Sequence, residues 1–219
     1  MRGRRTSLAP KAASKWSESV KTLTFTPEHE ERDSQPSQSS QMTIVDDERH
    51  EVLYFAYGSN LSTEQMRSRC PFSTAIGLGF LPSWRWIINE RGFANIVSPT
   101  HPSSSSNAPA DTAGGVYGLL YLLPPRDEES LDVFEGVPGA YGKVQCQVRW
   151  VRDGDGKPIP GGGETVTALV YVDERRTGDG TPRQEYIGRM ERGIEDAVRN
   201  WGLEEEYANR VMRKWWKCA

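Results

Sequence analysis

The chain has 219 residues, of which 36% are hydrophobic, and its seven Trp and eight Tyr supply enough apolar surface for one globular core without disulfide staples. Its formal net charge of −3 gives no reason to expect a nucleic-acid partner or binding to an anionic membrane, and no segment is long and apolar enough to cross a bilayer. Three cysteines in unrelated contexts argue against a secreted disulfide framework, so a cytoplasmic protein is expected.

The first 50 residues differ from the rest, because they are polar and contain few large apolar side chains. A run of Ser, Gln and Pro at residues 34–41 indicates disorder. The first 25 residues contain six Arg and Lys against the single acid Glu18, a pattern found in organelle transit peptides and in many ordinary N-termini. We therefore predict a disordered tail over residues 1–50 and one domain over residues 51–219, with mitochondrial import left open.

The most informative stretch runs from Leu53 to Leu61, where an apolar strand leads into a loop of small residues and then into the start of a helix. Ser62 and Gln65 have the spacing of a capping box, in which both side chains satisfy free donors of the new helix. The backbone amides of residues 58–61 are then left pointing out of the turn, and donors at such a position favour a carboxylate or phosphate. The pattern predicts an anion-binding loop, and ordinary packing of a strand, a turn and a helix is the alternative.

Patterns of apolar and polar residues predict the strands that follow. The clearest strand contains Cys146 and Val148, where apolar and polar residues alternate with a period of two. A glycine-rich turn over residues 153–163 follows it, and residues 101–112 are predicted to form a long loop. The expected strands lie at residues 52–57, 84–88, 93–98, 116–123, 143–151 and 166–172.

A short helix is predicted from Arg126 to Phe134, with Gly136 as the residue that ends it. Glu135 would then lie in the last turn, where unpaired carbonyls make the helix end electronegative. This potential and the flanking Phe134 and Val137 disfavour the ionised form, so we expect the pKa of Glu135 to lie above its ordinary value. Such a carboxyl group can accept and return a proton near neutral pH, whereas a solvated glutamate at a helix end is the alternative.

Two amphipathic helices, separated by Gly202, are predicted in the C-terminal part of the chain. Apolar stripes of this kind pack in a protein core more often than they line a binding groove, so we expect both helices to pack on the core. The first stripe consists of Ile187, Met190, Ile194, Ala197 and Trp201, and the second of Leu203, Tyr207, Val211 and Trp215.

The sequence gives little evidence for a metal site, a catalytic triad, a dinucleotide-binding motif or a cysteine nucleophile. The three histidines lie in the tail or in the predicted loop without partners at ligand spacing, so neither a zinc site nor a histidine-based triad is expected. Gly77-Leu78-Gly79 is followed by residues that do not open a helix, which breaks the dinucleotide-binding pattern. Cys70 and Cys146 are predicted to be small buried hydrophobes rather than nucleophiles. We therefore expect neither a metal nor a cofactor.

The loop and the segment around Glu135 together resemble the γ-glutamyl cyclotransferase-like family, whose members carry such a loop after the first strand. In many branches a Glu-Gly segment supplies the catalytic acid and base. The resemblance covers roughly Val52 to Tyr186 in the order that the family uses. It implies an α+β fold, with a mixed β-barrel or sheet packed with helices. The matching segments are residues 53–61, 66–71, 92–99, 116–120 and 131–141.

The resemblance implies a reaction that needs no cofactor. The α-amine of a γ-glutamyl amino acid or peptide attacks its own side-chain amide carbon, which yields 5-oxoproline and a free amine or amino acid. Glu135 would take the proton from the attacking amine and return it to the leaving nitrogen. The same chemistry on glutathione or a glutathione-derived adduct is one alternative, and a non-enzymatic ligand-binding member of the fold is another.

The resemblance also implies the residues that bind the small-molecule substrate. The loop amides would hold its α-carboxylate or carbonyl oxygen, and Tyr57 would form a wall of the pocket. The hydroxyls of Tyr141, Tyr171 and Tyr186 would surround the substrate. The loop resembles most the branch that acts on γ-glutamyl amino acids, and the sequence leaves the exact substrate and a homodimer open. The implied binding residues are Tyr57, Gly58, Ser59, Asn60, Leu61, Tyr141, Tyr171 and Tyr186.

Overall fold

The structure is a computed structural model that describes residues 50–100 and 114–217. The predicted tail, except His50, and the predicted loop over residues 101–112 lie outside the described residues, so both stay predictions. The described elements are β1 (Val52–Ala56), η1 (Ser59–Leu61), α1 (Thr63–Arg69), β2 (Thr74–Pro82), β3 (Arg85–Ile88), β4 (Ala94–Val97), β5 (Gly115–Leu123), α2 (Pro125–Glu135), β6 (Gly142–Arg152), η3 (Pro160–Gly162), β7 (Thr165–Val172), α3 (Gln184–Trp201), α4 (Glu205–Tyr207), η4 (Ala208–Met212) and η5 (Arg213–Trp215).

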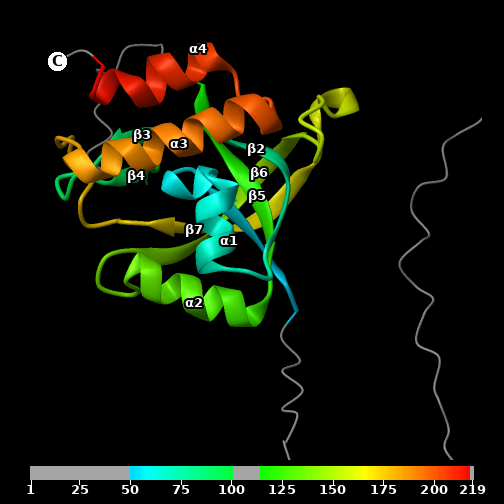
Figure 1. Ribbon diagram of the computed structural model, residues 1–219, viewed down its shortest axis with the longest axis horizontal. Helices are drawn as coiled ribbons and strands as arrows, with labels where there is room; N and C mark the ends of the chain where they lie inside the picture. Colours follow the sequence, from blue (N-terminus) through cyan, green and yellow to red (C-terminus); the bar gives the residue numbers. More distant parts are fainter. Residues whose placement is uncertain (1–49, 101–113, 218–219) are drawn as a thin grey trace, which may run out of the picture. The chain divides into compact units, whose positions relative to one another are not determined.

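Five strands close into a barrel in the order β1-β5-β2-β6-β7, and β3 and β4 form a separate two-stranded sheet (Figure 1). Neighbouring barrel strands are antiparallel, except that β1 and β7 pair in parallel where Tyr54 faces Leu169. Phe55 and Leu120 are fully buried in the core between the strands. The expected α+β class, with a mixed barrel packed with helices, is confirmed.

The six predicted strands are all present, and their ends agree with the prediction to within one residue. A further barrel strand, β2, was not predicted, because Gly77, Gly79 and Pro82 are residues that strands usually avoid. The structure explains the two glycines. β2 bulges between Ala75 and Gly77, and a Cβ atom on Gly79 would lie 2.6 Å from Val148 Cγ1. The glycines therefore allow close packing inside the barrel rather than forming a turn.

The helix before Glu135 ends as expected, since Gly136 follows α2 in the left-handed conformation with φ 66°. Gly202 ends α3 in the same way, with φ 72°. The prediction of one continuous second helix is wrong, because the chain forms a single α-helical turn, then the π-helix η4 and the 3₁₀ helix η5. Leu203 and Tyr207 are nevertheless buried, so the second stripe is core packing.

Helices cover the barrel and place the loop after β1 between them. α1 packs on α2, and α3 packs on η1 (Figure 1). A Cβ atom on Gly193 of α3 would lie 3.0 Å from Leu61 Cβ, so this glycine lets the helix approach the loop closely. None of the described helices is long and apolar enough to span a membrane.

Candidate functional site

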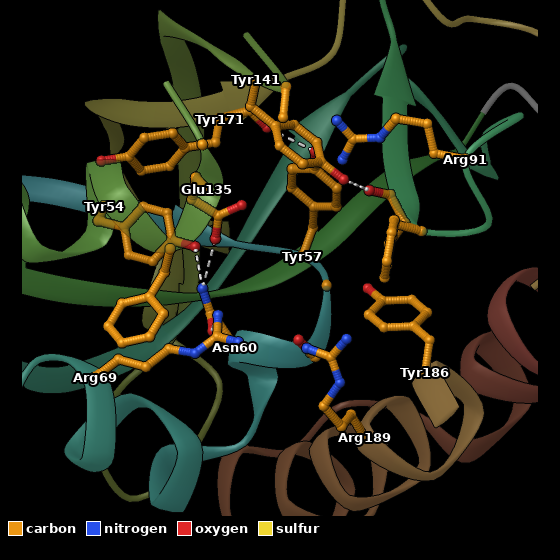
Figure 2. A pocket seen from close by; sticks show the side chains of 17 residues that line it. Tyr54, Tyr57, Asn60, Arg69, Arg91, Glu135, Tyr141, Tyr171, Tyr186 and Arg189 are labelled. Carbon is orange, nitrogen blue, oxygen red and sulfur yellow. Dashed lines mark hydrogen bonds between the residues drawn. The ribbon is translucent and has the colours of Figure 1, made fainter. Parts of the chain in front are cut away.

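A pocket of about 250 Å³ opens where the loop after β1 meets the end of α2, and it is formed by residues from both sheets, from η1 and from α1, α2 and α3 (Figure 2). Among the described residues that line the pocket, Glu135 is the one acidic side chain. The lining consists of Tyr54, Tyr57, Gly58, Ser59, Asn60, Arg69, Arg91, Phe93, Ala94, Phe134, Glu135, Gly136, Ala140, Tyr141, Tyr171, Tyr186 and Arg189.

Asn60 connects the loop to Glu135. Its Nδ2 donates hydrogen bonds to Glu135 Oε1 at 3.1 Å and to the Tyr54 hydroxyl at 3.0 Å. Its Oδ1 accepts hydrogen bonds from Gln65 Nε2 at 2.8 Å and from Arg69 Nη1 at 3.1 Å. These two donors fix the orientation of the amide, so the Nδ2 group must face the carboxylate. The Asn60 side chain is thus a positioned donor toward Glu135.

The capping-box prediction is correct in one half and wrong in the other. Ser62 Oγ accepts a hydrogen bond from the Gln65 backbone N–H at 3.2 Å, as a capping serine should. The Gln65 side chain does not bind back to the backbone of Ser62, because it donates to Ser59 Oγ at 2.9 Å and to Asn60 Oδ1. Its role is to hold the loop residues rather than the helix end.

The loop after β1 forms the 3₁₀ turn η1, and this changes which amides are available. The Leu61 backbone N–H donates to the Gly58 carbonyl at 2.9 Å, and the Leu61 side chain is fully buried. Leu61 is therefore not part of the pocket, contrary to the sequence-based expectation. Gly58, Ser59 and Asn60 do line it, and they lie at the N-terminal end of η1. Because the Ser59 backbone is in turn hydrogen-bonded to Tyr186, the predicted group of four free amides is reduced to Gly58 and Asn60.

Gly58 is needed where it lies because of a tyrosine on α3. A Cβ atom on Gly58 would be 3.1 Å from the Tyr186 hydroxyl oxygen and 3.4 Å from Ala94 Cβ. Burial raises the pKa of Tyr186 to about 12, and hydrogen bonds from the backbone at Ala94 and Ser59 partly oppose this effect. The Tyr186 hydroxyl therefore stays protonated at neutral pH and lies beside the loop amides.

The other three predicted binding tyrosines line the pocket with their rings, while their hydroxyls are used elsewhere. The Tyr57 hydroxyl donates to the Tyr171 carbonyl at 2.6 Å, and the Tyr141 hydroxyl donates to the Ala94 carbonyl at 2.9 Å. The Tyr171 hydroxyl points away from Glu135 (Figure 2) and donates to Asp132 Oδ1 at 2.6 Å. These hydroxyls hold the pocket walls together. The Tyr171 hydroxyl is bound to Asp132 rather than directed at the pocket, whereas contact of the Tyr141 hydroxyl with the substrate stays a prediction.

The Tyr171 contact also anchors α2. Lys143 Nζ on β6 lies 2.7 Å from Asp132 Oδ2 and 2.7 Å from Glu128 Oε1. Asp132 thus joins α2 to both β6 and β7, three residues before Glu135. The network fixes the end of α2 against the barrel.

Burial raises the pKa of Glu135 above its ordinary value, as the sequence predicted. The adjacent Arg69 opposes the rise most, followed by the hydrogen bond from Asn60 and then by Arg91 and Arg189. Phe134 is 56% exposed, and its ring centre lies 4.9 Å from the Arg69 guanidinium. Burial among the residues of the pocket is the main cause of the rise in the pKa of Glu135.

The three arginines of the pocket were not predicted from the sequence. Arg69 comes from the last turn of α1, Arg91 from the turn between β3 and β4, and Arg189 from α3. Arg189 follows Tyr186 by three residues, a spacing that places two side chains on the same face of a helix. That spacing was an available signal, whereas nothing local distinguishes Arg91.

The described residues outside the pocket offer no competing chemistry. No group of three His, Cys, Asp or Glu side chains that could hold a metal ion occurs in residues 50–100 and 114–217. Cys70 and Cys146 are buried, and burial raises the pKa of the Cys70 thiol to about 12 and that of Cys146 to about 11. Both are small buried hydrophobes, as predicted.

Comparison with known proteins gives one matching family model, described as "Gamma-glutamyl cyclotransferase, AIG2-like", over residues 54–188. The chain is 29% identical over 154 residues to the γ-glutamyl cyclotransferase gliK of Aspergillus fumigatus. The alignment covers 65% of this chain and 56% of the relative, so the chain spans little more than half the length of that curated protein.

Solved structures share the fold. One, named γ-glutamyl cyclotransferase, is 23% identical with a TM-score of 0.55, and the match covers 74% of this chain and 86% of the other. YkqA from Bacillus subtilis is 21% identical with a TM-score of 0.54, and the match covers 76% of this chain and 54% of the other. At these identities the likeness supports the architecture of the barrel and its helices.

Proposed function

The chain belongs to the γ-glutamyl cyclotransferase, AIG2-like family, and on this premise we propose that it converts a γ-glutamyl amino acid or peptide into 5-oxoproline and a free amine or amino acid. The observation that carries the proposal is Glu135 in the pocket, with a pKa raised by burial and with Asn60 Nδ2 at 3.1 Å from its carboxylate. Family membership supports the reaction class, and the pocket supports Glu135 as its catalytic residue.

Glu135 performs both proton transfers in this mechanism. Its carboxylate takes a proton from the substrate α-ammonium, and the resulting amine attacks the γ-carbonyl carbon to form the new C–N bond of the ring. The tetrahedral intermediate then collapses as the bond to the leaving nitrogen breaks. Over the reaction two protons pass from the attacking nitrogen to the leaving nitrogen, which departs as an ammonium group. A carboxyl group with a raised pKa is suited to accept and return these protons near neutral pH.

The loop and Tyr186 stabilise the oxyanion. The N-terminal end of η1 presents backbone donors at Gly58 and Asn60, and the protonated Tyr186 hydroxyl, which is hydrogen-bonded to the Ser59 backbone, lies beside them. Preorganised donors of this kind favour the charge that develops on the carbonyl oxygen. Asn60 has a different task, because its side chain fixes the Glu135 carboxylate through Nδ2.

The size of the pocket favours a small substrate. Its volume of about 250 Å³ lies just below the range of roughly 300–1,000 Å³ typical of pockets for drug-sized ligands. A γ-glutamyl head group with one further residue suits such a space, whereas a glutathione-derived adduct would extend into solvent. We therefore place γ-glutamyl amino acids and short peptides first and glutathione-derived adducts second.

The test is incubation of the purified full chain with a panel of γ-glutamyl amino acids, glutathione and glutathione adducts, with mass spectrometric detection of 5-oxoproline. The expected result is 5-oxoproline in equal amount to the released amine, with the highest kcat/KM for a γ-glutamyl amino acid. Absence of 5-oxoproline with every compound, in a preparation that binds one of them, would instead support a ligand-binding member of the fold.

A further inference from the structure

The pocket contains more positive charge than the reaction at Glu135 requires. Three guanidinium groups, from Arg69, Arg91 and Arg189, line it and favour the ionised form of Glu135. Glu135 is the acid among the described lining residues, so an excess of positive charge remains even when it is ionised. Such an excess favours a ligand with net negative charge.

Two of these arginines already have partners. Arg69 donates to Asn60 Oδ1 at 3.1 Å and lies over the Phe134 ring. Arg189 pairs with Glu185 one turn away on α3, at 3.1 Å, but the Glu185 side chain is 60% exposed. Because Glu185 is so exposed to solvent, this ion pair neutralises little of the positive charge of Arg189 in the pocket.

Arg91 is the least satisfied of the three. Its nearest acid, Asp173, is 3.9 Å from Nη1, and Asp173 Oδ2 already accepts from Arg176 at 2.9 Å and from Asn89 at 3.1 Å. Arg91 Nε is buried and has no hydrogen-bond partner among the described residues, while the side chain is only 23% exposed. A buried donor without a partner is unfavourable, so a ligand acceptor near this guanidinium would relieve a cost.

The turn that carries Arg91 is held in place before any ligand binds. The Asn89 backbone N–H donates to the Phe93 carbonyl at 2.9 Å, and Asn89 Oδ1 accepts from the Arg91 backbone N–H at 3.1 Å. The guanidinium lies 4.9 Å from the centre of the Tyr141 ring. Figure 2 shows it across Glu135 from Asn60 and Arg69. A preorganised guanidinium loses less freedom on binding a carboxylate than a mobile one.

We infer that Arg91 binds a carboxylate on the leaving amine of the substrate, and that the pocket thereby selects γ-glutamyl amino acids and peptides over γ-glutamylamines. The inference rests on the proposed function. The γ-glutamyl head carries one ammonium and one carboxylate and has no net charge, so the excess positive charge is left for the additional carboxylate of the leaving amino acid. Arg91 reaches the pocket beside Tyr141 and Phe93, and the Phe93 ring is 5.1 Å from the Tyr186 ring. A γ-glutamylamine has no net charge at neutral pH, whereas a γ-glutamyl amino acid carries one negative charge that matches the excess in the pocket. The planar guanidinium can bind its carboxylate through two parallel hydrogen bonds.

Two substrates that differ only in this carboxylate provide the test, namely γ-glutamyl-alanine and γ-glutamyl-ethylamine. For the wild-type chain we expect kcat/KM to be about 10- to 100-fold higher for γ-glutamyl-alanine, the range for a hydrogen-bonded charge pair. Arg91→Gln should reduce this ratio to nearly one. Arg91→Lys, which keeps the charge but not the planar fork, should leave an intermediate ratio. Arg192→Gln, which removes a charge from an exposed position on α3, should leave the ratio unchanged.

The outcomes separate this inference from the proposed function. If the wild-type chain forms no 5-oxoproline from either compound, the proposed function fails and the inference fails with it. If it turns over both with equal kcat/KM, the proposed function stands and the selectivity is refuted. Arg91→Gln could also lower kcat/KM by the same factor for both substrates, with an unchanged melting temperature. That result would assign Arg91 to the γ-glutamyl head that both substrates share, and it would refute the inference. If the Gln variant does not fold, an unchanged ratio in Arg91→Lys serves as the refuting result.

Discussion

Replacing Asn60 by alanine tests how the pocket controls the ionisation of Glu135. Asn60 Nδ2 donates to Glu135 Oε1 at 3.1 Å, and this bond favours the ionised carboxylate. Without it, burial acts on Glu135 with less opposition. We therefore expect Asn60→Ala to raise the pKa of Glu135 further above its ordinary value.

The size of the effect follows from the strength of the bond. A hydrogen bond to a charged group contributes about 1.5–3 kcal/mol, and a change of one pKa unit corresponds to about 1.4 kcal/mol. The 3.1 Å distance places this bond at the weaker end, so its loss should disfavour the ionised carboxylate by about 1.5 kcal/mol. At pH values below the wild-type pKa of Glu135, the ionised fraction, and with it the rate, should then fall about tenfold relative to the wild-type chain.

The assay is the pH dependence of kcat/KM for 5-oxoproline formation, whose acidic limb reports the essential base of the free enzyme. Gln65→Ala is the matched control, because it removes a donor to Asn60 Oδ1 but leaves Arg69 to orient the amide toward Glu135. The control should lose some thermal stability while its acidic limb stays in place. An acidic limb that is the same in Asn60→Ala and the wild-type chain would refute the role assigned to Asn60.

Three further predictions concern stability and boundaries. The pKa of Glu135 is raised in the folded state. Below the unfolded pKa of about 4.3, Glu135 is protonated in both states and its ionisation costs no stability. As the pH rises from there through the folded pKa, its ionisation increasingly destabilises the fold. Glu135→Gln should thus melt at a higher temperature than the wild-type chain at pH 7 but at the same temperature near pH 4, and a lower melting temperature at pH 7 would contradict burial as the cause. Tyr171→Phe removes the 2.6 Å hydrogen bond to Asp132 outside the pocket, so unfolding free energy should fall by about 1 kcal/mol while kcat/KM changes less than about twofold. A KM raised tenfold would instead place that hydroxyl on the substrate. A truncated protein beginning at Asp47 should keep the melting temperature and the activity of the full chain, because the sequence before it has little apolar surface to bury, and a large loss of either would show that the tail packs on the domain.

The parts of the fold that depend on local patterns could be predicted from the sequence. The strand with alternating Cys146 and Val148 needs only its own residues to define a buried and an exposed face. The helix that ends at Gly136 likewise depends on a glycine at the right position, which is why Glu135 was placed correctly at its last turn. β2 could not be predicted in this way, because its glycines are explained only by the strand that packs against them.

The direction of side chains in the pocket depends on contacts between distant segments, and there the sequence was less informative. Tyr171 was expected to point its hydroxyl at the substrate, but Asp132 on α2 accepts its hydrogen bond. The Leu61 amide was expected to be free, but a 3₁₀ turn closes on the Gly58 carbonyl. Arg91 reaches the pocket only because the β3–β4 turn folds beside it, a relation that no local pattern encodes.

The most direct measurement of the central claim is 5-oxoproline formation by Glu135→Gln alongside the wild-type chain, with substrate binding measured calorimetrically on the same preparations. Glutamine keeps the size of glutamate but cannot accept and return a proton. The account predicts that the rate falls by about 10⁴-fold, the upper end of the range for a general acid–base group, because one residue serves both transfers. Substrate affinity should persist, since the proposal assigns substrate binding to the η1 amides, Tyr186 and Arg91 rather than to Glu135. Turnover by the variant within a few-fold of the wild-type rate would contradict the catalytic role of Glu135.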